Sequence, residues 1–284
     1  MFAVTGASGH LGRLVIDALL SRTDPRNILA LARDPAKLAD LAERGVTVRA
    51  FDYSVPDSLA AALGDVDRLL LISSSEVGQR ETQHRAVIDA AKAAGVGFIA
   101  YTSILHADAN PLDLAVEHRG TETALQESGI SYALLRNGWY NENYTIGLDG
   151  VVEHGVLIGS VGEARVAAAS RKDYAEAAAI ILAQEPPETN TYELAGDSGF
   201  TQAELAAAIA AASGKPVVYQ DLPEADYAAA LEGFGIPGPL AHILADSSAK
   251  AGKGALFDDS GTLGRLIGRP TTPIAVSVQE ALQG

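Results

Sequence analysis

A run of seven residues near the start of the chain, Gly6-Ala7-Ser8-Gly9-His10-Leu11-Gly12, has the types and spacing that suit the binding of phosphate groups. Glycine lets the backbone approach a ligand without a Cβ atom in the way, and a helix N-terminus attracts anions. A short apolar segment precedes the run. Apolar residues at helical spacing follow it, at Leu11, Leu14, Val15, Ala18 and Leu19. This context predicts a cradle for the pyrophosphate of a dinucleotide rather than a plain glycine turn, with His10 contributing its backbone and not its imidazole.

Arg33 lies 21 residues after Gly12, close to the position where an NAD-selective site places a carboxylate on the ribose 2′-hydroxyl. An arginine there can instead form planar bidentate bonds to a 2′-phosphate. The next residue, Asp34, would oppose a phosphate. Because Pro35 follows it, however, Asp34 is expected to cap a helix and point at its own backbone. We therefore expect NADPH as the cofactor, with NADH bound more weakly.

Polar residues also follow other strand-like segments, where ligands of such folds bind. Asp52 could accept a hydrogen bond from the adenine amine while Tyr53 lies against the ring, or the pair could form an Asx turn and a surface tyrosine. Small hydroxyl side chains suit a chain that passes close to ribose and nicotinamide, although they also end strands without any function. These candidates are Ser73, Ser74, Ser75, Thr102 and Ser103.

The usual acid–base pair of carbonyl-reducing short-chain dehydrogenases is a tyrosine four residues before a lysine that lowers the pKa of the phenol. None of the nine tyrosines has a lysine four residues later. Ordinary alcohol or ketone chemistry by that route is therefore not expected. His118, on the helix that would carry the pair, could donate a proton or could simply be solvated. The same two interpretations apply to His106, which is nearer the expected nicotinamide end.

Strand-like and helical patterns alternate through the first half of the chain, which predicts a doubly wound parallel sheet of the Rossmann type. In such sheets ligands bind beyond the carboxyl ends of the strands. Strands are expected over residues 28–32, 46–51, 69–72, 96–101 and 132–135, and helices over about 34–44, from 56, over 79–94 and over 112–127.

Past about residue 145 the alternation loosens. Residues 151–158 could be extended, Asp173 is expected to cap a helix that runs to Leu182, and Thr201-Gln202-Ala203-Glu204 has the spacing of a capping box. We predict an NADP-binding Rossmann domain over residues 1–145, joined by strand-forming segments further on. Residues 146–284 are expected to form a smaller α/β lobe that covers the substrate.

Composition excludes several classes of function. The 284 residues include 21 Lys+Arg against 36 Asp+Glu, giving a formal net charge of −15, which argues against nucleic acid as a partner. There is no cysteine, and no cluster of histidines or carboxylates has metal-ligand spacing, so no metal is expected. No apolar run reaches the roughly 18 residues of a spanning helix, and a strand-like segment begins the chain directly. A soluble cytoplasmic protein without membrane insertion is expected.

Several segments together resemble the NmrA-like group of atypical short-chain dehydrogenases, and more closely the type 2 NAD(P)H:quinone oxidoreductases. The likeness runs nearly from end to end. Besides the glycine-rich run, its segments are Arg33-Asp34-Pro35-Ala36-Lys37, Asp52-Tyr53, Tyr101-Thr102-Ser103, Leu134-Leu135-Arg136-Asn137-Gly138-Trp139-Tyr140, Tyr192-Glu193-Leu194-Ala195-Gly196-Asp197 and Leu256-Phe257-Asp258-Asp259-Ser260.

The resemblance implies NADPH bound without flavin, and a hydride passed directly to a small quinone. A quinone can take protons from water or a weak donor after the hydride arrives, which is consistent with the missing tyrosine–lysine pair. Catalysis would then be mostly the positioning of two flat rings. By the same resemblance Asn137, Trp139, Tyr140 and Asn143 would line the nicotinamide and quinone pocket, with Gly138 beside the cofactor.

Asn137, Tyr140, Asn143 and His106 are accordingly the candidates for catalytic contacts. Trp139 and Tyr140 could instead simply pack the lobe onto the sheet. The protein could also act as a homodimer.

Two other functions stay open. One is the reduction of another flat conjugated acceptor, such as a triphenylmethane dye. The other is a redox-sensing regulator that binds the dinucleotide without turning it over. The Asn, Trp and Tyr residues after the strand at 132–135 favour an enzyme, whereas the missing acid–base pair is the feature that a sensor would show.

Overall fold

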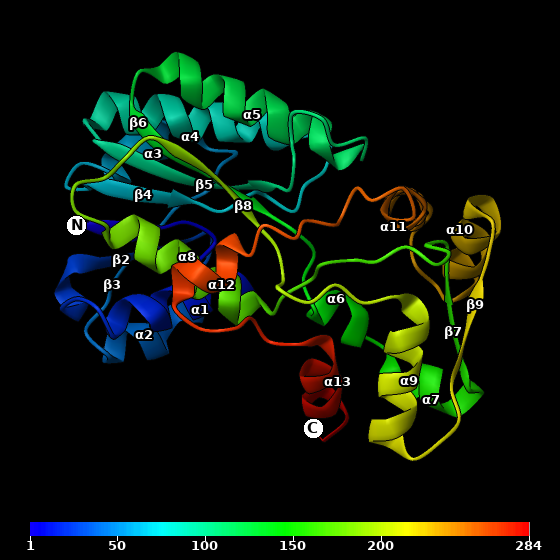
Figure 1. Ribbon diagram of the computed structural model, residues 1–284. Coiled ribbons are helices and arrows are strands. Elements are labelled where there is room, and N and C mark those ends of the chain that lie inside the picture. Colours follow the sequence, from blue (N-terminus) through cyan, green and yellow to red (C-terminus); the bar gives the residue numbers. More distant parts are fainter. Residues whose placement is uncertain (284) are drawn as a thin grey trace. The chain divides into compact units, whose positions relative to one another are not determined.

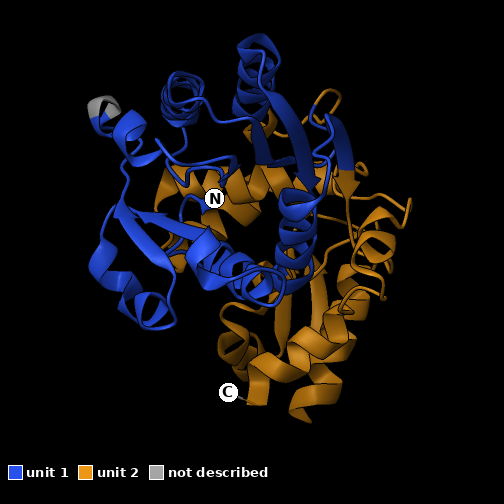
Figure 2. Cartoon of the chain, turned by 90° about the vertical axis from the view of Figure 1, so that its left-hand side faces the viewer, with its two compact units in different colours: residues 1–107, 116–137, 171–192 blue, residues 108–115, 138–170, 193–284 orange. Residues whose placement is uncertain are grey.

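The computed structural model describes residues 1–283, except for the side chains of Pro56 and Asp57. The chain forms two compact units, which Figure 2 shows in different colours. The first comprises residues 1–107, 116–137 and 171–192, and the second comprises residues 108–115, 138–170 and 193 onward. The chain passes between the two several times. The predicted functional division near residue 145 stays a prediction.

The first unit is built on a seven-stranded sheet with the order β3-β2-β1-β4-β5-β6-β8. Strand β1 pairs in parallel with β2 on one side and with β4 on the other, and β2–β3, β4–β5 and β5–β6 are parallel as well. This order confirms the predicted doubly wound Rossmann-type sheet. The strands are β1 Phe2–Val4, β2 Ile28–Ala32, β3 Thr47–Ala50, β4 Arg68–Leu71, β5 Phe98–Ile104, β6 Ser131–Asn137 and β8 Asn190–Leu194.

Helices cover both faces of this sheet, with α4 and α5 on one face and α1 and α8 on the other (Figure 1). A strand that is covered on both faces must be apolar in both directions, which explains the continuous apolar run of the inner strand β2. All five residues of β2 are buried. The helices are α1 His10–Leu20, α2 Ala39–Glu43, α3 Pro56–Ala62, α4 Arg80–Ala94, α5 Leu114–Ser128 and α8 Arg171–Ala183, with short 3-10 turns at Pro25–Asn27 and Pro35–Leu38.

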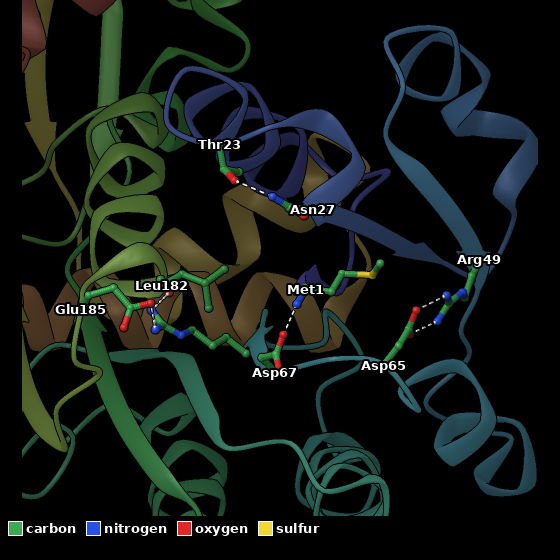
Figure 3. Close-up of polar contacts among 9 residues, drawn as sticks. Met1, Thr23, Asn27, Arg49, Asp65, Asp67, Leu182 and Glu185 are labelled. Atoms are coloured by element: carbon green, nitrogen blue, oxygen red, sulfur yellow. Dashed lines mark hydrogen bonds and ion pairs between the residues drawn. The ribbon is translucent and has the colours of Figure 1, made fainter.

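A buried arginine ties the end of α8 to the sheet. The Arg68 guanidinium, at the start of β4, donates to the carbonyl oxygens of Leu182 at 3.0 Å and Gln184 at 2.6 Å, and pairs with the Glu185 carboxylate. Figure 3 shows Leu182 and Glu185 in this cluster. The guanidinium also lies 5.6 Å from the centre of the Phe2 ring. These bonds satisfy carbonyl groups that the helix end leaves without partners.

The second unit contains a two-stranded parallel sheet of β7 Val156–Gly159 and β9 Val218–Asp221. The capping box predicted at residues 201–204 is confirmed. Thr201 Oγ1 accepts from the Glu204 N–H at 3.1 Å, and the Glu204 carboxylate accepts from the Thr201 N–H at 2.9 Å. The helices are α6 Glu142–Thr145, α7 Leu148–His154, α9 Gln202–Ser213, α10 Glu224–Gly233, α11 Gly238–Ala251, α12 Thr262–Ile267 and α13 Ile274–Gln283.

Four predicted boundaries are wrong. Residues 151–158 are not one extended segment, because α7 runs to His154 and ends at Gly155, whose φ of +70° is the left-handed conformation of a helix C-terminus. Asp173 lies inside the first turn of α8, which begins at Arg171, so it does not cap that helix. Strands β5 and β6 extend to Ile104 and Asn137. Thr102, Ser103 and Asn137, which are predicted to follow these strands, therefore lie inside their carboxyl ends.

Candidate functional site

The glycine-rich turn lies at the carboxyl end of β1 and leads into α1. Gly6 has a φ of +60°, and its carbonyl accepts from the Gly9 N–H at 2.9 Å. A Cβ atom on Gly12 would lie 2.8 Å from Ala7 Cα and would collide with the Gly6 carbonyl oxygen. The turn therefore packs directly against the first turn of the helix, which requires glycine at position 12.

The start of α1 has no capping side chain. Gly9 is the N-cap residue, with extended backbone, and the first turn contains no acidic residue. The first N–H groups of a helix have no partner within the helix and carry a partial positive charge. Gly6, Ser8, Gly9 and His10 are exposed. The turn therefore fits a phosphate group, which would supply the acceptors that the sequence does not.

Arg33 follows β2, the strand next to β1, and so lies at the same edge of the sheet. Its side chain is 68% exposed, and its Nη1 atom lies 2.9 Å from Glu76 Oε1. The Asp34 carboxylate accepts from the Ala36 N–H at 3.1 Å, which confirms the predicted cap. Asp34 is thus turned toward its own backbone, and the Arg33 guanidinium is accessible to an anion.

Asp52 and Tyr53 both have partners within the protein. The Asp52 carboxylate accepts from the Ser54 N–H at 2.9 Å, so the Asx turn considered from the sequence is present. Tyr53 is half-buried, and its hydroxyl lies 2.5 Å from Thr5 Oγ1 and 2.9 Å from the Ile72 carbonyl oxygen. Burial raises the pKa of this phenol. A role for this pair beside adenine stays a prediction.

The backbone that follows β4 is held by side chains from three other elements. The N–H groups of Ile72, Ser73 and Ser74 donate to Thr5 Oγ1 at 2.9 Å, to Thr102 Oγ1 at 2.8 Å and to His84 Nε2 at 2.9 Å. Ser74 Oγ accepts from the Glu76 N–H at 3.1 Å, and Ser75 is exposed. By contrast, the buried Ser73 Oγ has no hydrogen-bond partner among the described residues.

A buried ion pair joins the ends of β5 and β6 to α5. Arg136 donates from Nε at 3.0 Å and from Nη2 at 2.8 Å to the Glu122 carboxylate, and Ser103 Oγ donates to the same carboxylate at 2.5 Å. The Arg136 and Glu122 side chains are only 11% and 6% exposed. Ser103 and Arg136 are neighbours in the register of the two strands. The Ser103 hydroxyl, predicted to contact the cofactor, therefore belongs to this cluster.

Asn137 ends β6 at the same edge of the sheet. Its backbone carbonyl accepts from the Leu105 N–H at 2.9 Å. Its side chain is buried, and its Oδ1 atom has no hydrogen-bond partner in the part of the chain that the structure describes. A buried amide oxygen without a partner is costly unless a ligand or water satisfies it, so Asn137 fits a ligand-binding position.

The two candidate histidines differ in their surroundings. His118 is buried, and its Nδ1 atom lies 2.7 Å from the Tyr101 hydroxyl, so it is not a solvated surface residue. Burial lowers the pKa of His118 to about 3, which keeps the ring neutral. His106 is half-buried and has a φ of +52°, an unusual conformation for a residue other than glycine. Its catalytic role stays a prediction.

The remaining candidates lie in the second unit. The Gly138 N–H donates to the Leu194 carbonyl at 2.7 Å, and the Trp139 carbonyl accepts from the Ala169 N–H at 3.2 Å. Tyr140 forms a parallel bridge with Ala169. The Trp139 and Tyr140 side chains are partly exposed and Asn143 is exposed. These bonds set the backbone of residues 138–143, while the substrate contacts of their side chains stay predictions.

Sequence reasoning did not identify His84 or Glu122 as parts of this edge of the sheet. Both are polar residues on helices, and only the faces that α4 and α5 turn toward the sheet distinguish them from solvated positions. Among the side chains that the structure describes, no three His, Asp or Glu residues gather as metal ligands would. No described helix is both long enough and apolar enough to cross a bilayer.

Known proteins resemble this chain over its full length. The sequence profile of the NAD(P)H-binding family matches residues 6–185. Quinone oxidoreductase 2 of Escherichia coli (strain K12) is 56% identical over 278 residues, which cover 98% of this chain and 97% of the relative. The crystal structure of the NADPH-dependent quinone oxidoreductase from E. coli, complexed with NADPH, has a TM-score of 0.97 at 55% identity and covers 99% of this chain and 100% of that one. The triphenylmethane reductase of Citrobacter sp., complexed with NADP(H), has a TM-score of 0.95 at 36% identity, with coverage of 99% and 100%.

Proposed function

The chain belongs to the NAD(P)H-binding family, and on that basis we propose that it is an oxidoreductase that uses NADPH to reduce quinones to hydroquinones in one two-electron step. The observation that carries the proposal is the start of α1, where a glycine-packed turn meets a helix that has no capping side chain. The full-length similarity to quinone oxidoreductase 2 of E. coli supports a quinone as the acceptor.

The described residues suggest how the cofactor is held. The N–H groups of the glycine-rich turn would bind the pyrophosphate and Arg33 the 2′-phosphate. At the carboxyl ends of β4 and β6, Ser73 Oγ and Asn137 Oδ1 are buried and have no hydrogen-bond partner among the described residues. They would bind hydroxyl or amide groups nearer the nicotinamide. Bound NADPH supplies a hydride, and the proposed reaction needs neither flavin nor metal.

The proposed acceptor contacts are those that the family resemblance implies, together with His106. We propose that residues 1–145, with the later strand-forming segments, bind NADPH and that residues 146–284 cover the quinone. Trp139 and Tyr140 would lie against the flat rings, and Asn143 and His106 would bond the quinone oxygens. Since His118 is buried and neutral, the proton that completes the hydroquinone would come from water.

The test mixes purified protein with NADPH and a small benzoquinone and follows the absorbance of the reduced nicotinamide. One NADPH consumed per hydroquinone formed, without added flavin or metal, supports the proposal. A reductase of triphenylmethane dyes is the second candidate, favoured by the likeness to the Citrobacter enzyme. Oxidation of NADPH with dyes alone would select that candidate, and binding without oxidation would select a redox sensor.

Arg33→Ala is expected to raise the dissociation constant of NADPH by about tenfold to hundredfold, because a charge-assisted hydrogen bond contributes about 1.5–3 kcal/mol. The dissociation constant of NADH, which lacks the 2′-phosphate, should change little. Calorimetric titration with both nucleotides measures the difference. The matched control is Arg26→Ala, since Arg26 is an exposed arginine paired with Asp24 in the turn before β2. Unchanged NADPH affinity in Arg33→Ala would exclude Arg33 as the phosphate ligand.

A further inference from the structure

The backbone that follows β4 is held in place by a histidine of α4, His84, which belongs to none of the sequence motifs described above. Beyond Leu71 the backbone N–H groups no longer have strand partners, and His84, near the start of α4, supplies the acceptor for Ser74. We infer that His84 is a positioning residue of the NADPH site, which fixes the Ser73–Ser74 backbone through its Nε2 atom without touching the cofactor. The inference rests on the proposed function, because it assigns that segment to NADPH binding.

The hydrogen bonds around His84 allow only one tautomer. An amide N–H can only donate, so Nε2 must be the unprotonated acceptor and the ring proton must lie on Nδ1. Nδ1 is 2.9 Å from Thr121 Oγ1, and that hydroxyl donates onward to the Glu117 carbonyl oxygen at 3.0 Å. Each hydrogen bond in the series from Ser74 to Glu117 thus has a defined direction, with His84 and Thr121 each accepting one bond and donating the next.

The surroundings of His84 preserve this state. The ring is fully buried, and it packs edge-on between Tyr53 and Tyr101, with ring centres 6.1 and 5.5 Å away. Burial, followed by the positive charge of Arg80, lowers the pKa of His84 to about 3. The neutral acceptor form is therefore the form present at neutral pH.

Further bonds attach the same segment to α4 and α5. Arg80 Nε donates to the Ser74 carbonyl at 2.6 Å, and Glu117 Oε1 accepts from the N–H groups of Gly78 at 2.9 Å and Arg80 at 3.2 Å. Ser74 is thus held at both its N–H and its carbonyl group. His84 is the partner of the N–H group, so its loss would leave the Ser73–Ser74 peptide without this hydrogen bond.

The segment held in this way carries two groups that the proposed function assigns to the cofactor site. Ser73 Oγ is buried and has no hydrogen-bond partner in the described part of the chain. Glu76, whose N–H donates to Ser74 Oγ, pairs with Arg33 at 2.9 Å. A shift of the Ser74 peptide would therefore displace the proposed contacts of both the ribose and the 2′-phosphate. If His84 positions this segment, its loss should weaken NADPH binding. If His84 only fills the core, its loss should lower stability alone.

The experiment compares His84→Leu with His84→Gln by calorimetric titration of NADPH. Leucine removes the acceptor but retains apolar bulk, whereas a glutamine side chain can present its Oε1 oxygen near the position of Nε2. We expect His84→Leu to raise the dissociation constant and the KM of NADPH about tenfold, and His84→Gln to restore most of that affinity. In both variants kcat at saturating NADPH and the KM of the quinone should stay within about twofold of the wild-type values.

Two outcomes overturn the inference. One is an unchanged NADPH affinity in His84→Leu, even with a lower melting temperature, since His84 would then serve stability alone. The other is an equal loss of affinity in both variants, because the acceptor atom would then not matter. If His84→Leu does not fold, Thr121→Val replaces it. This variant removes the partner of Nδ1 from α5 and should raise the dissociation constant about threefold, and an unchanged value would again overturn the inference.

The titration separates this inference from the proposed function. If the wild-type protein binds NADPH but oxidises none with any quinone, the proposed reaction is wrong, while the affinities of the variants still decide the role of His84. If the protein turns over quinone and His84→Leu binds NADPH normally, the reaction stands and the positioning role is wrong. Slower hydrogen exchange at the Ser74 amide in the wild type than in His84→Leu would show the bond directly.

Discussion

The Gly12→Ala variant is expected to bind NADPH at least about a hundredfold more weakly than the wild type. The added methyl group would lie 2.8 Å from Ala7 Cα and would collide with the Gly6 carbonyl oxygen, and both are backbone atoms that cannot move aside cheaply. The turn would have to separate from α1, and the N–H groups that hold the pyrophosphate would no longer converge. Calorimetric titration with NADPH measures the loss, and circular dichroism checks that the fold is retained.

The control for this prediction is Gly150→Ala. Gly150 lies inside α7, and a Cβ atom there would meet nothing within 4 Å. Alanine is the better helix former, so this variant should bind NADPH normally and gain up to about 1 kcal/mol in the free energy of unfolding. If Gly12→Ala bound NADPH as well as Gly150→Ala does, the glycine-rich turn would not be the pyrophosphate cradle.

Glu122→Gln is expected to lower the free energy of unfolding by about 3–5 kcal/mol, as when one partner of a buried ion pair is removed. Arg136 would keep its positive charge in a site where both side chains are nearly inaccessible, and Ser103 would lose its charged acceptor. Urea denaturation of the two proteins measures the difference. Because the cluster joins the ends of β5 and β6, part of the loss should also appear as weaker NADPH binding.

Asp65→Asn provides the matched control, because Arg49 and Asp65 form a bidentate pair of the same kind, at 2.6 and 2.8 Å (Figure 3). Here the side chains are 32% and 51% exposed, so the loss should not exceed about 1 kcal/mol. The Arg49 guanidinium lowers the pKa of Asp65, so this small contribution is present at neutral pH and is lost as the pH falls through the lowered pKa. Equal losses in Asp65→Asn and Glu122→Gln would mean that burial does not distinguish the two pairs.

Local signals in the sequence predicted most of the fold. The Asp34-Pro35 cap and the Thr201–Glu204 capping box are confirmed because each depends on hydrogen bonds within three residues. The predicted extended segment at 151–158 is wrong because two adjacent valines favour a strand locally, whereas the left-handed Gly155 that ends α7 decides the outcome.

The hydrogen-bond partners of individual side chains were less predictable from the sequence than the helices and strands. Tyr53 bonds to Thr5, which is 48 positions away, and Ser103 bonds to Glu122, which is 19 positions away. The sequence leaves His118 open as a solvated or proton-donating residue, whereas the structure shows it buried against Tyr101. In each case the partner depends on which face of a helix is turned toward the sheet. Helical spacing alone does not settle this where polar residues occupy both faces.

By itself the sequence determined the Rossmann-type sheet, the place of the glycine-rich turn and the position of Arg33 after β2. Each of these depends on residues that are close together in the chain. Only the tertiary structure decided that Ser103 belongs to a buried ion pair and that His84 holds the backbone after β4. The same is true of Ser73 and Asn137, which keep buried polar atoms without partners among the residues that the structure describes. The physical reason is that parallel strands bring their carboxyl ends together across long stretches of chain. The polar groups that meet at that edge therefore come from segments that share no local pattern.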